Sequence, residues 1–135
     1  MTGNPVHKRK PARILIIDDD DVLRGAIAQA LDDAGFATRE APDGEQGIAE
    51  FRKAPSDLVI TDILMPAKEG IETIRELRRL SSGVGIIAMS GGGSMLKTSY
   101  LDVARQLGAN AILQKPFRMR ALLDAVDTCL ERTDG

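Results

Sequence analysis

The sequence has few of the residues that build disulfide frameworks, multi-cysteine metal sites or aromatic surfaces. Its 135 residues include one cysteine, no tryptophan, one tyrosine and three phenylalanines. A single cysteine excludes an intramolecular disulfide and a metal site made of several cysteines. No apolar run approaches the roughly 18 residues of a membrane span, and the N-terminus has no apolar stretch typical of a signal peptide. We therefore expect a cytoplasmic protein with no membrane partner.

Neither sign of charge is in large excess. Lysine and arginine number 18 against 20 aspartate and glutamate, for a net charge of −2. This balance lacks the basic footprint of a nucleic-acid-binding protein, so we expect no nucleic-acid partner. Apolar residues make up 43% and charged residues 28% of the chain, as in an ordinary globular domain. We expect a flexible basic N-terminal arm over 1–11, one folded domain over 12–132 and a tail over 133–135.

Short β-rich runs alternate with helical patterns along the folded region. Continuous apolar runs at 14–17, 58–60 and 86–89 are typical of strands buried on both faces. Weaker runs at 37–41 and 111–113 predict edge strands. Amphipathic helical spacing follows each run, at 23–31, 48–51, 71–77, 96–107 and 119–130. This alternation predicts an α/β fold, a doubly wound five-stranded parallel sheet with helices on both faces.

Acidic residues follow two of the predicted central strands. Asp18, Asp19, Asp20 and Asp21 come directly after the first, and Asp62 ends the third. Because the carboxyl ends of such strands line the ligand crevice, these carboxylates would repel one another unless a divalent cation neutralised them. Oxygen ligands favour Mg²⁺, or Mn²⁺, over zinc. Asp20 and Asp21 suit capping of the next helix, whereas Asp18, Asp19 and Asp62 predict a metal site.

A hydroxyl and an ammonium follow the two remaining strands at the same edge of the sheet. Ser90 precedes three glycines, and Lys115 precedes Pro116. Together with a metal, these groups are what a phosphoryl group needs, because its oxygens require hydrogen bonds and neutralisation of charge. The glycines are equally compatible with a flexible loop alone. No Walker A pattern is present, which argues against a nucleotide-binding P-loop.

In their order and separation these motifs resemble the receiver domain of two-component response regulators. The resemblance covers about residues 13–131 and implies the flavodoxin-like (βα)5 form of the predicted sheet. The motifs that carry it are Asp18-Asp19, the segment from Asp57 to Pro66, Gly70, Ser90 and Lys115-Pro116-Phe117.

The resemblance implies a metal-binding role for four residues. Asp19 and Asp62 would ligate Mg²⁺ directly, together with the backbone carbonyl of Leu64. Asp18 would hold the ion through a water molecule. Mn²⁺ would suit the same oxygen ligands.

The resemblance also implies how a phosphoryl group would be bound. Asp62 would be the nucleophile that takes the group from a phosphohistidine. Ser90 would donate a hydrogen bond to one phosphoryl oxygen, and Lys115 would pair with another. A cis peptide before Pro116 is implied as well.

Three positions bear on how phosphorylation would be reported to the output face and on how long it would last. The strand residue three before Lys115 is aromatic in the family and is Ile112 here, so we expect the output face to switch differently or weakly. Leu64 and Gly92 occupy the two positions that, in the family, flank the water molecule that attacks the acyl phosphate. Because apolar Leu64 cannot orient a water molecule, we expect slow autodephosphorylation.

The resemblance implies a phosphoacceptor signalling module, not a true enzyme. Four residues follow Glu131, so we expect a stand-alone receiver that takes its phosphoryl group from a sensor histidine kinase or a histidine phosphotransfer protein. It would then bind an unidentified downstream protein or pass the group along a phosphorelay, and a weak homodimer is allowed.

Two alternatives remain open. The first is a degenerate receiver that acts as a phosphorylation-independent interaction scaffold. The second is a Mg²⁺-dependent hydrolase that forms an aspartyl phosphate, although Leu64 stands where such an enzyme needs a general acid. Elsewhere, we expect Cys129 to be buried in the core.

Overall fold

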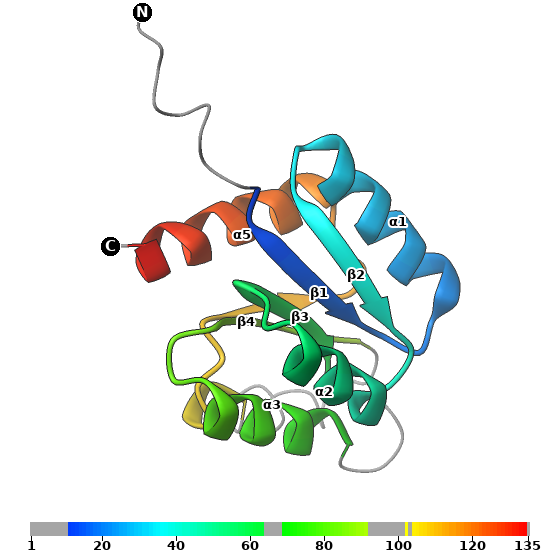
Figure 1. The fold of residues 1–135 in the computed structure, drawn as a ribbon. Coiled ribbons are helices and arrows are strands. Elements are labelled where there is room, and N and C mark those ends of the chain that lie inside the picture. Colours follow the sequence, from blue (N-terminus) through cyan, green and yellow to red (C-terminus); the bar gives the residue numbers. More distant parts are fainter. Residues whose placement is uncertain (1–10, 64–68, 92–101, 103, 135) are drawn as a thin grey trace, which may run out of the picture.

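The computed structural model describes residues 11–63, 69–91, 102 and 104–134 (Figure 1). Its elements in chain order are β1 Arg13–Ile17, α1 Asp21–Asp33, β2 Ala37–Ala41, α2 Gly44–Lys53, β3 Leu58–Asp62, α3 Glu69–Leu80, β4 Gly85–Ser90, β5 Ala111–Gln114 and α5 Met119–Asp134. Residues 102 and 104–106 are also helical, within the predicted 96–107 pattern, most of which lies outside the described residues.

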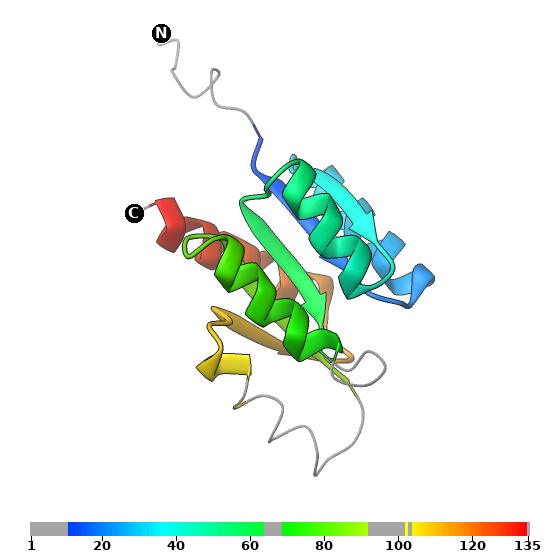
Figure 2. The ribbon, with the colours of Figure 1, turned by 60° about the horizontal axis from the view of Figure 1, so that its bottom comes forward.

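The five strands form one parallel sheet in the order β2-β1-β3-β4-β5. Helices α1 and α5 cover one face, and α2 and α3 cover the other (Figures 1 and 2). The three continuous apolar runs are the central strands, and the two weaker runs are the edges, as the sequence predicted. The predicted doubly wound α/β fold is therefore confirmed.

Two apolar layers hold the helices to the sheet. In β1, Leu15 and Ile17 pack with Phe51 of α2 on one face, whereas Ile14 and Ile16 pack with residues of α1 and α5 on the other. This alternation explains why β1 is apolar at consecutive positions, because both faces of the strand are covered. Cys129 is buried in the second layer, as predicted.

Local signals set the helix ends. Asp20 caps α1, and its carboxylate accepts hydrogen bonds from the backbone N–H groups of Val22 and Leu23. Asp43 caps α2 in the same way. Gly35, with a φ of 97°, follows α1 in the left-handed conformation that glycine adopts most easily.

The predicted boundaries of the arm, the folded domain and the tail stay predictions. Residues 1–10 of the predicted arm lie outside the described residues. Helix α5 continues to Asp134, two residues into the predicted tail over 133–135. Among the described helices, none is both long enough and apolar enough to cross a bilayer.

Candidate metal and phosphoryl site

The carboxyl ends of β1 and β3 bring three acidic side chains together. Carboxylate oxygens of Asp18, Asp19 and Asp62 all lie within 4.8 Å of one another. Asp18 and Asp62 are buried, whereas Asp19 is exposed. The structure thus places together the trio that the sequence singled out, in an arrangement of oxygen donors suited to a hard divalent cation.

Asp18 is fully enclosed and held from several sides. Its Oδ1 accepts a hydrogen bond from the Asp20 N–H at 2.9 Å, and its own N–H donates to the Ala41 carbonyl at 3.2 Å. Its carbonyl oxygen accepts from Nη1 of Arg24 at 2.6 Å. Hydrogen bonds to both the carboxylate and the backbone therefore fix Asp18 at the end of β1.

Lys115 joins the two buried carboxylates. Its Nζ lies 3.0 Å from Asp18 Oδ2 and 3.1 Å from Asp62 Oδ2. Partial burial alone would lower the pKa of Lys115, but the hydrogen bonds and charges of Asp18 and Asp62 outweigh burial and raise that pKa above its usual value. The peptide bond between Lys115 and Pro116 is cis, as the resemblance implied. The site therefore contains a charged ammonium in contact with two acids.

Ser90 ends β4 one residue beyond the position paired with Asp62. Its side chain is 1% exposed, and Oγ has no hydrogen-bond partner among the described residues. A buried hydroxyl without a partner costs free energy. A ligand oxygen at this edge of the sheet would satisfy it, so this atom fits the predicted phosphoryl contact.

Gly70 brings the start of α3 against the end of β3. A Cβ on this glycine would lie 2.3 Å from Ile63 Cα and 2.7 Å from the Asp62 carbonyl oxygen. Real Cβ atoms do not approach backbone so closely, so only glycine allows this contact. The glycine noted in the sequence thus lets the helix pack directly behind Asp62.

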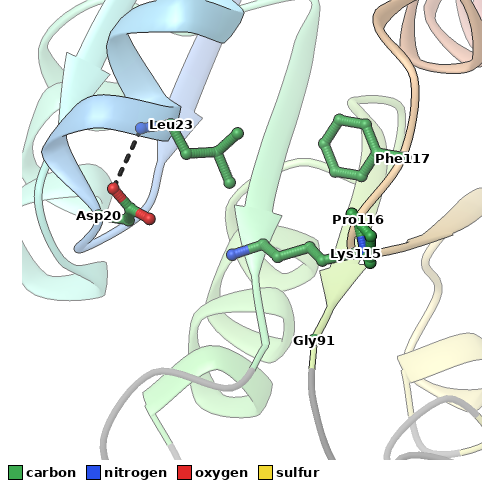
Figure 3. Close-up of a pocket in the computed structure, with 6 residues that line it drawn as sticks. All are labelled: Asp20, Leu23, Gly91, Lys115, Pro116 and Phe117. Carbon is green, nitrogen blue, oxygen red and sulfur yellow. Dashed lines mark hydrogen bonds between the residues drawn. The ribbon is translucent and has the colours of Figure 1, made fainter.

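A cavity of about 460 Å³ opens beside the Lys115 side chain (Figure 3). Leu23, Pro116 and Phe117 supply apolar walls, and Gly91 completes the lining next to Lys115 with Asp20 on the α1 side (Figure 3). A Cβ on Gly91 would lie 3.3 Å from Lys115 Cδ. The cavity therefore borders the Lys115 side chain at the carboxyl edge of the sheet.

Three other positions complete the comparison with the sequence. Leu64 and Gly92 lie outside the described residues, so the third predicted metal ligand stays a prediction. Ile112 is partly buried against the core. Arg24 was not predicted to lie near the site. Its only sequence signal is its position three residues after Asp21 on the same helix.

Comparison with known proteins adds independent findings. The family model for the response regulator receiver domain matches residues 14–127. The transcriptional regulatory protein CpxR of Klebsiella pneumoniae is 36% identical over 121 residues, which cover 90% of this chain and 50% of that protein. The DNA-binding response regulator MtrA of Mycobacterium tuberculosis is 36% identical over 124 residues, which cover 90% and 52%. This chain spans about half the length of these curated relatives.

A solved structure supports the same relationship. The CheY-like receiver domain protein of Methanospirillum hungatei is similar with a TM-score of 0.83 and 27% identity, over 92% of this chain and 97% of that one. DNA binding belongs to the name of the mycobacterial relative. For this chain, the expected lack of a nucleic-acid partner stays a prediction.

Proposed function

Because this chain belongs to the response regulator receiver domain family, we propose that it accepts a phosphoryl group on Asp62 from a phosphohistidine. Receiver domains are phosphoacceptor domains of signalling proteins. The observation that carries the proposal is the convergence of Lys115 with Asp18 and Asp62, at the same edge of the sheet as the buried Ser90 hydroxyl, which has no hydrogen-bond partner among the described residues. Each of these groups matches a need of phosphoryl transfer.

The transfer is a displacement at phosphorus. A carboxylate oxygen of Asp62 forms a bond to phosphorus as the bond between phosphorus and the imidazole nitrogen breaks, and the electron pair stays on that nitrogen. The product is an acyl phosphate on Asp62. Lys115 offsets negative charge on one phosphoryl oxygen, and the Ser90 hydroxyl donates a hydrogen bond to another. Without these two groups, the negative charges of the Asp62 carboxylate and of the phosphoryl group would repel each other during the attack.

The acidic trio supports a divalent cation at the same place. Asp18, Asp19 and Asp62 offer oxygen atoms within 4.8 Å of one another, and this donor set fits Mg²⁺, or Mn²⁺, better than zinc. They would hold the ion together with the backbone carbonyl of Leu64, with Asp18 acting through water. When bound, the ion offsets the charge of the attacking carboxylate and of the phosphoryl oxygens.

The proposed donor is a sensor histidine kinase or a histidine phosphotransfer protein. After phosphorylation, the chain binds a downstream protein target or passes the group to another histidine. We propose slow autodephosphorylation as well, because the residue two after Asp62 is the apolar Leu64. Rapid loss of the phosphoryl group in Mg²⁺ buffer would contradict that last point alone.

The test is direct phosphorylation of the purified chain. Incubation with Mg²⁺ and acetyl phosphate, followed by intact mass measurement, should show the addition of one phosphoryl group. The Asp62→Asn variant removes the nucleophile with little change in shape and should show none. Omission of Mg²⁺ should greatly slow the addition.

Two results would overturn the proposal. No mass change in the unaltered chain, despite Mg²⁺ binding, would favour a phosphorylation-independent scaffold. Equal addition to the unaltered chain and to Asp62→Asn would place the phosphoryl group on another residue.

A further inference from the structure

Arg24 of α1 contacts three separate parts of the fold with its guanidinium group. Nη1 donates to the carbonyl oxygen of Asp18 at 2.6 Å, at the end of β1. Nη2 lies 2.7 Å from a carboxylate oxygen of Asp21, at the start of α1. Nε donates to a carboxylate oxygen of Glu40 at 3.1 Å, on the edge strand β2. The Arg24 side chain is only 14% exposed, whereas its carboxylate partners on Asp21 and Glu40 are 81% and 42% exposed, so the contact with the Asp18 carbonyl is the most enclosed of the three.

We propose that Arg24 is a positioning residue for the divalent cation. It fixes the peptide unit between Asp18 and Asp19 and so orients the Asp19 carboxylate toward the cation. The inference rests on the proposed function, because it concerns the cation that supports phosphorylation of Asp62. It assigns to Arg24 no contact with the ion or the phosphoryl group.

The planarity of the peptide bond carries the effect from Arg24 to Asp19. The Asp18 carbonyl, the Asp19 N–H and the Asp19 Cα lie in one plane. A hydrogen bond that fixes the direction of the carbonyl therefore fixes the direction in which the Asp19 backbone begins. The Asp19 side chain itself makes no hydrogen bond within the described part of the chain. Its orientation toward the cation thus depends on the backbone that Arg24 holds.

The two carboxylates differ in how they are supported. Asp18 is also held through its own carboxylate, by the Asp20 N–H and by Lys115. Asp19 is exposed and lacks such direct support within the described residues. Loss of Arg24 should therefore disturb Asp19 more than Asp18. Partners that orient metal ligands commonly change metal affinity by about 10- to 100-fold when they are removed.

If Arg24 acted through its charge alone, its removal would have the opposite effect on the affinity for the cation. A positive charge near the site repels a divalent cation, so its removal would strengthen cation binding. Loss of positioning would weaken binding instead. The sign of the change in affinity thus separates the two roles.

Lysine at this position tests the geometry at constant charge. Its ammonium is a single point on a flexible stem and cannot direct donors toward three acceptors as the planar guanidinium does. If charge were all that mattered, Arg24→Lys would bind Mg²⁺ as the unaltered chain does. If positioning matters, Arg24→Lys should lose affinity as Arg24→Met does.

The experiment is a calorimetric titration of the unphosphorylated full chain with Mg²⁺. We expect Arg24→Met and Arg24→Lys each to weaken Mg²⁺ binding by about tenfold or more. Arg52→Met is a matched control, because Arg52 forms an ion pair with Glu76 between α2 and α3 and is 59% exposed. Arg78→Met is a stability control, because Arg78 binds carbonyl groups that precede β4 and β5, opposite the site. Both controls should retain the affinity of the unaltered chain.

Three results would overturn the positioning role. Unchanged or stronger binding in Arg24→Met would show that Arg24 does not position the metal ligand, and full rescue by Arg24→Lys would show that the planar set of guanidinium donors is not needed. An equal loss of affinity in Arg78→Met would show that general destabilisation is the cause. Thermal unfolding of each variant identifies the temperatures at which it is folded, and Arg24→Lys keeps the test valid if Arg24→Met does not fold.

Failure of this inference can be distinguished from failure of the proposed function. If the unaltered chain binds Mg²⁺ and is phosphorylated on Asp62 while the Arg24 variants bind Mg²⁺ normally, only the positioning role is wrong. If the unaltered chain binds no Mg²⁺, both are wrong.

Discussion

Arg78 donates a hydrogen bond to the carbonyl oxygen of Val84 at 2.6 Å. The same guanidinium donates to the Gly108 carbonyl at 2.8 Å and to Oδ1 of Asn110 at 3.0 Å. Burial lowers the pKa of Arg78. One side chain of α3 thus ties together the segments that lead into β4 and β5, at the end of the sheet opposite the candidate site.

We predict that Arg78→Met lowers the free energy of unfolding by about 2 kcal/mol or more, since hydrogen bonds from a charged group are lost and carbonyl groups lose their partner. Urea denaturation measures the change. Arg79→Met is the matched control, because Arg79 is 70% exposed and pairs with Glu76 on the surface. Such a pair contributes about 0.5 kcal/mol or less. Equal losses in the two variants would contradict a special role for Arg78.

Gly70 leads to a prediction that links stability to the site. In Gly70→Ala, the added Cβ would overlap the backbone of Ile63 and Asp62. We expect a loss of about 2 kcal/mol in unfolding free energy, together with slower phosphorylation by acetyl phosphate, because the start of α3 must move away from the end of β3.

The control for Gly70 is another helical glycine. A Cβ on Gly25 of α1 would meet nothing within 4 Å. Because alanine favours the helix more than glycine does, Gly25→Ala should raise the unfolding free energy by ~0.5 to 1 kcal/mol. If both variants were stabilised, the close approach of α3 to β3 would be wrong.

The sequence predicted those features that depend on short-range pattern. The central strands are recognisable because both of their faces are covered, so β1 reads as an unbroken apolar run from Ile14 to Ile17. The parallel arrangement then places all strand ends at one edge. For that reason the sequence alone assigns Asp62, Ser90 and Lys115, each next to a predicted strand end, to one site.

The contacts of Arg24 and Arg78 could not be predicted in this way. Arg78 binds backbone carbonyl groups and an asparagine amide oxygen. Because every residue has a backbone carbonyl, the sequence does not show which of them accept these hydrogen bonds. Arg24 contacts Glu40 only because α1 packs beside β2 with a particular shift along the strand direction. Both depend on how elements are placed relative to one another, which periodicity does not specify.

Lys115→Met should make the stability of the protein depend more strongly on Mg²⁺. The substitution leaves Asp18 and Asp62 buried without the ammonium that pairs with them. We expect a loss of about 3 kcal/mol in the absence of divalent cations. Mg²⁺ should recover much of it, because the ion supplies the missing positive charge. Thermal unfolding with and without Mg²⁺ measures both effects.

Lys53→Met is the control for Lys115, because Lys53 is 72% exposed and its Nζ lies 3.8 Å from Glu50. It should change neither the stability nor the response to Mg²⁺. A Lys115→Met variant as stable as the unaltered chain in metal-free buffer would show that the ammonium does not neutralise the two acids.

Ser90→Ala should slow phosphorylation without lowering the free energy of unfolding. The Ser90 hydroxyl is buried and makes no hydrogen bond within the described residues, so its removal takes away no bond and relieves the cost of an unsatisfied polar atom. Urea denaturation should therefore show equal or higher unfolding free energy. Phosphorylation by acetyl phosphate, followed by intact mass, should be slower, because a phosphoryl oxygen loses its hydrogen-bond donor.

Ser81→Ala is the contrasting control for Ser90. Its Oγ accepts a hydrogen bond from the Val84 N–H at 3.1 Å, opposite the site. Its loss should cost about 1 kcal/mol of unfolding free energy and leave the phosphorylation rate unchanged. The two serines should thus show opposite patterns of stability and rate. A Ser90→Ala variant that is clearly destabilised would mean that the hydroxyl has a structural partner, and its assignment to the phosphoryl group would then lose its main support.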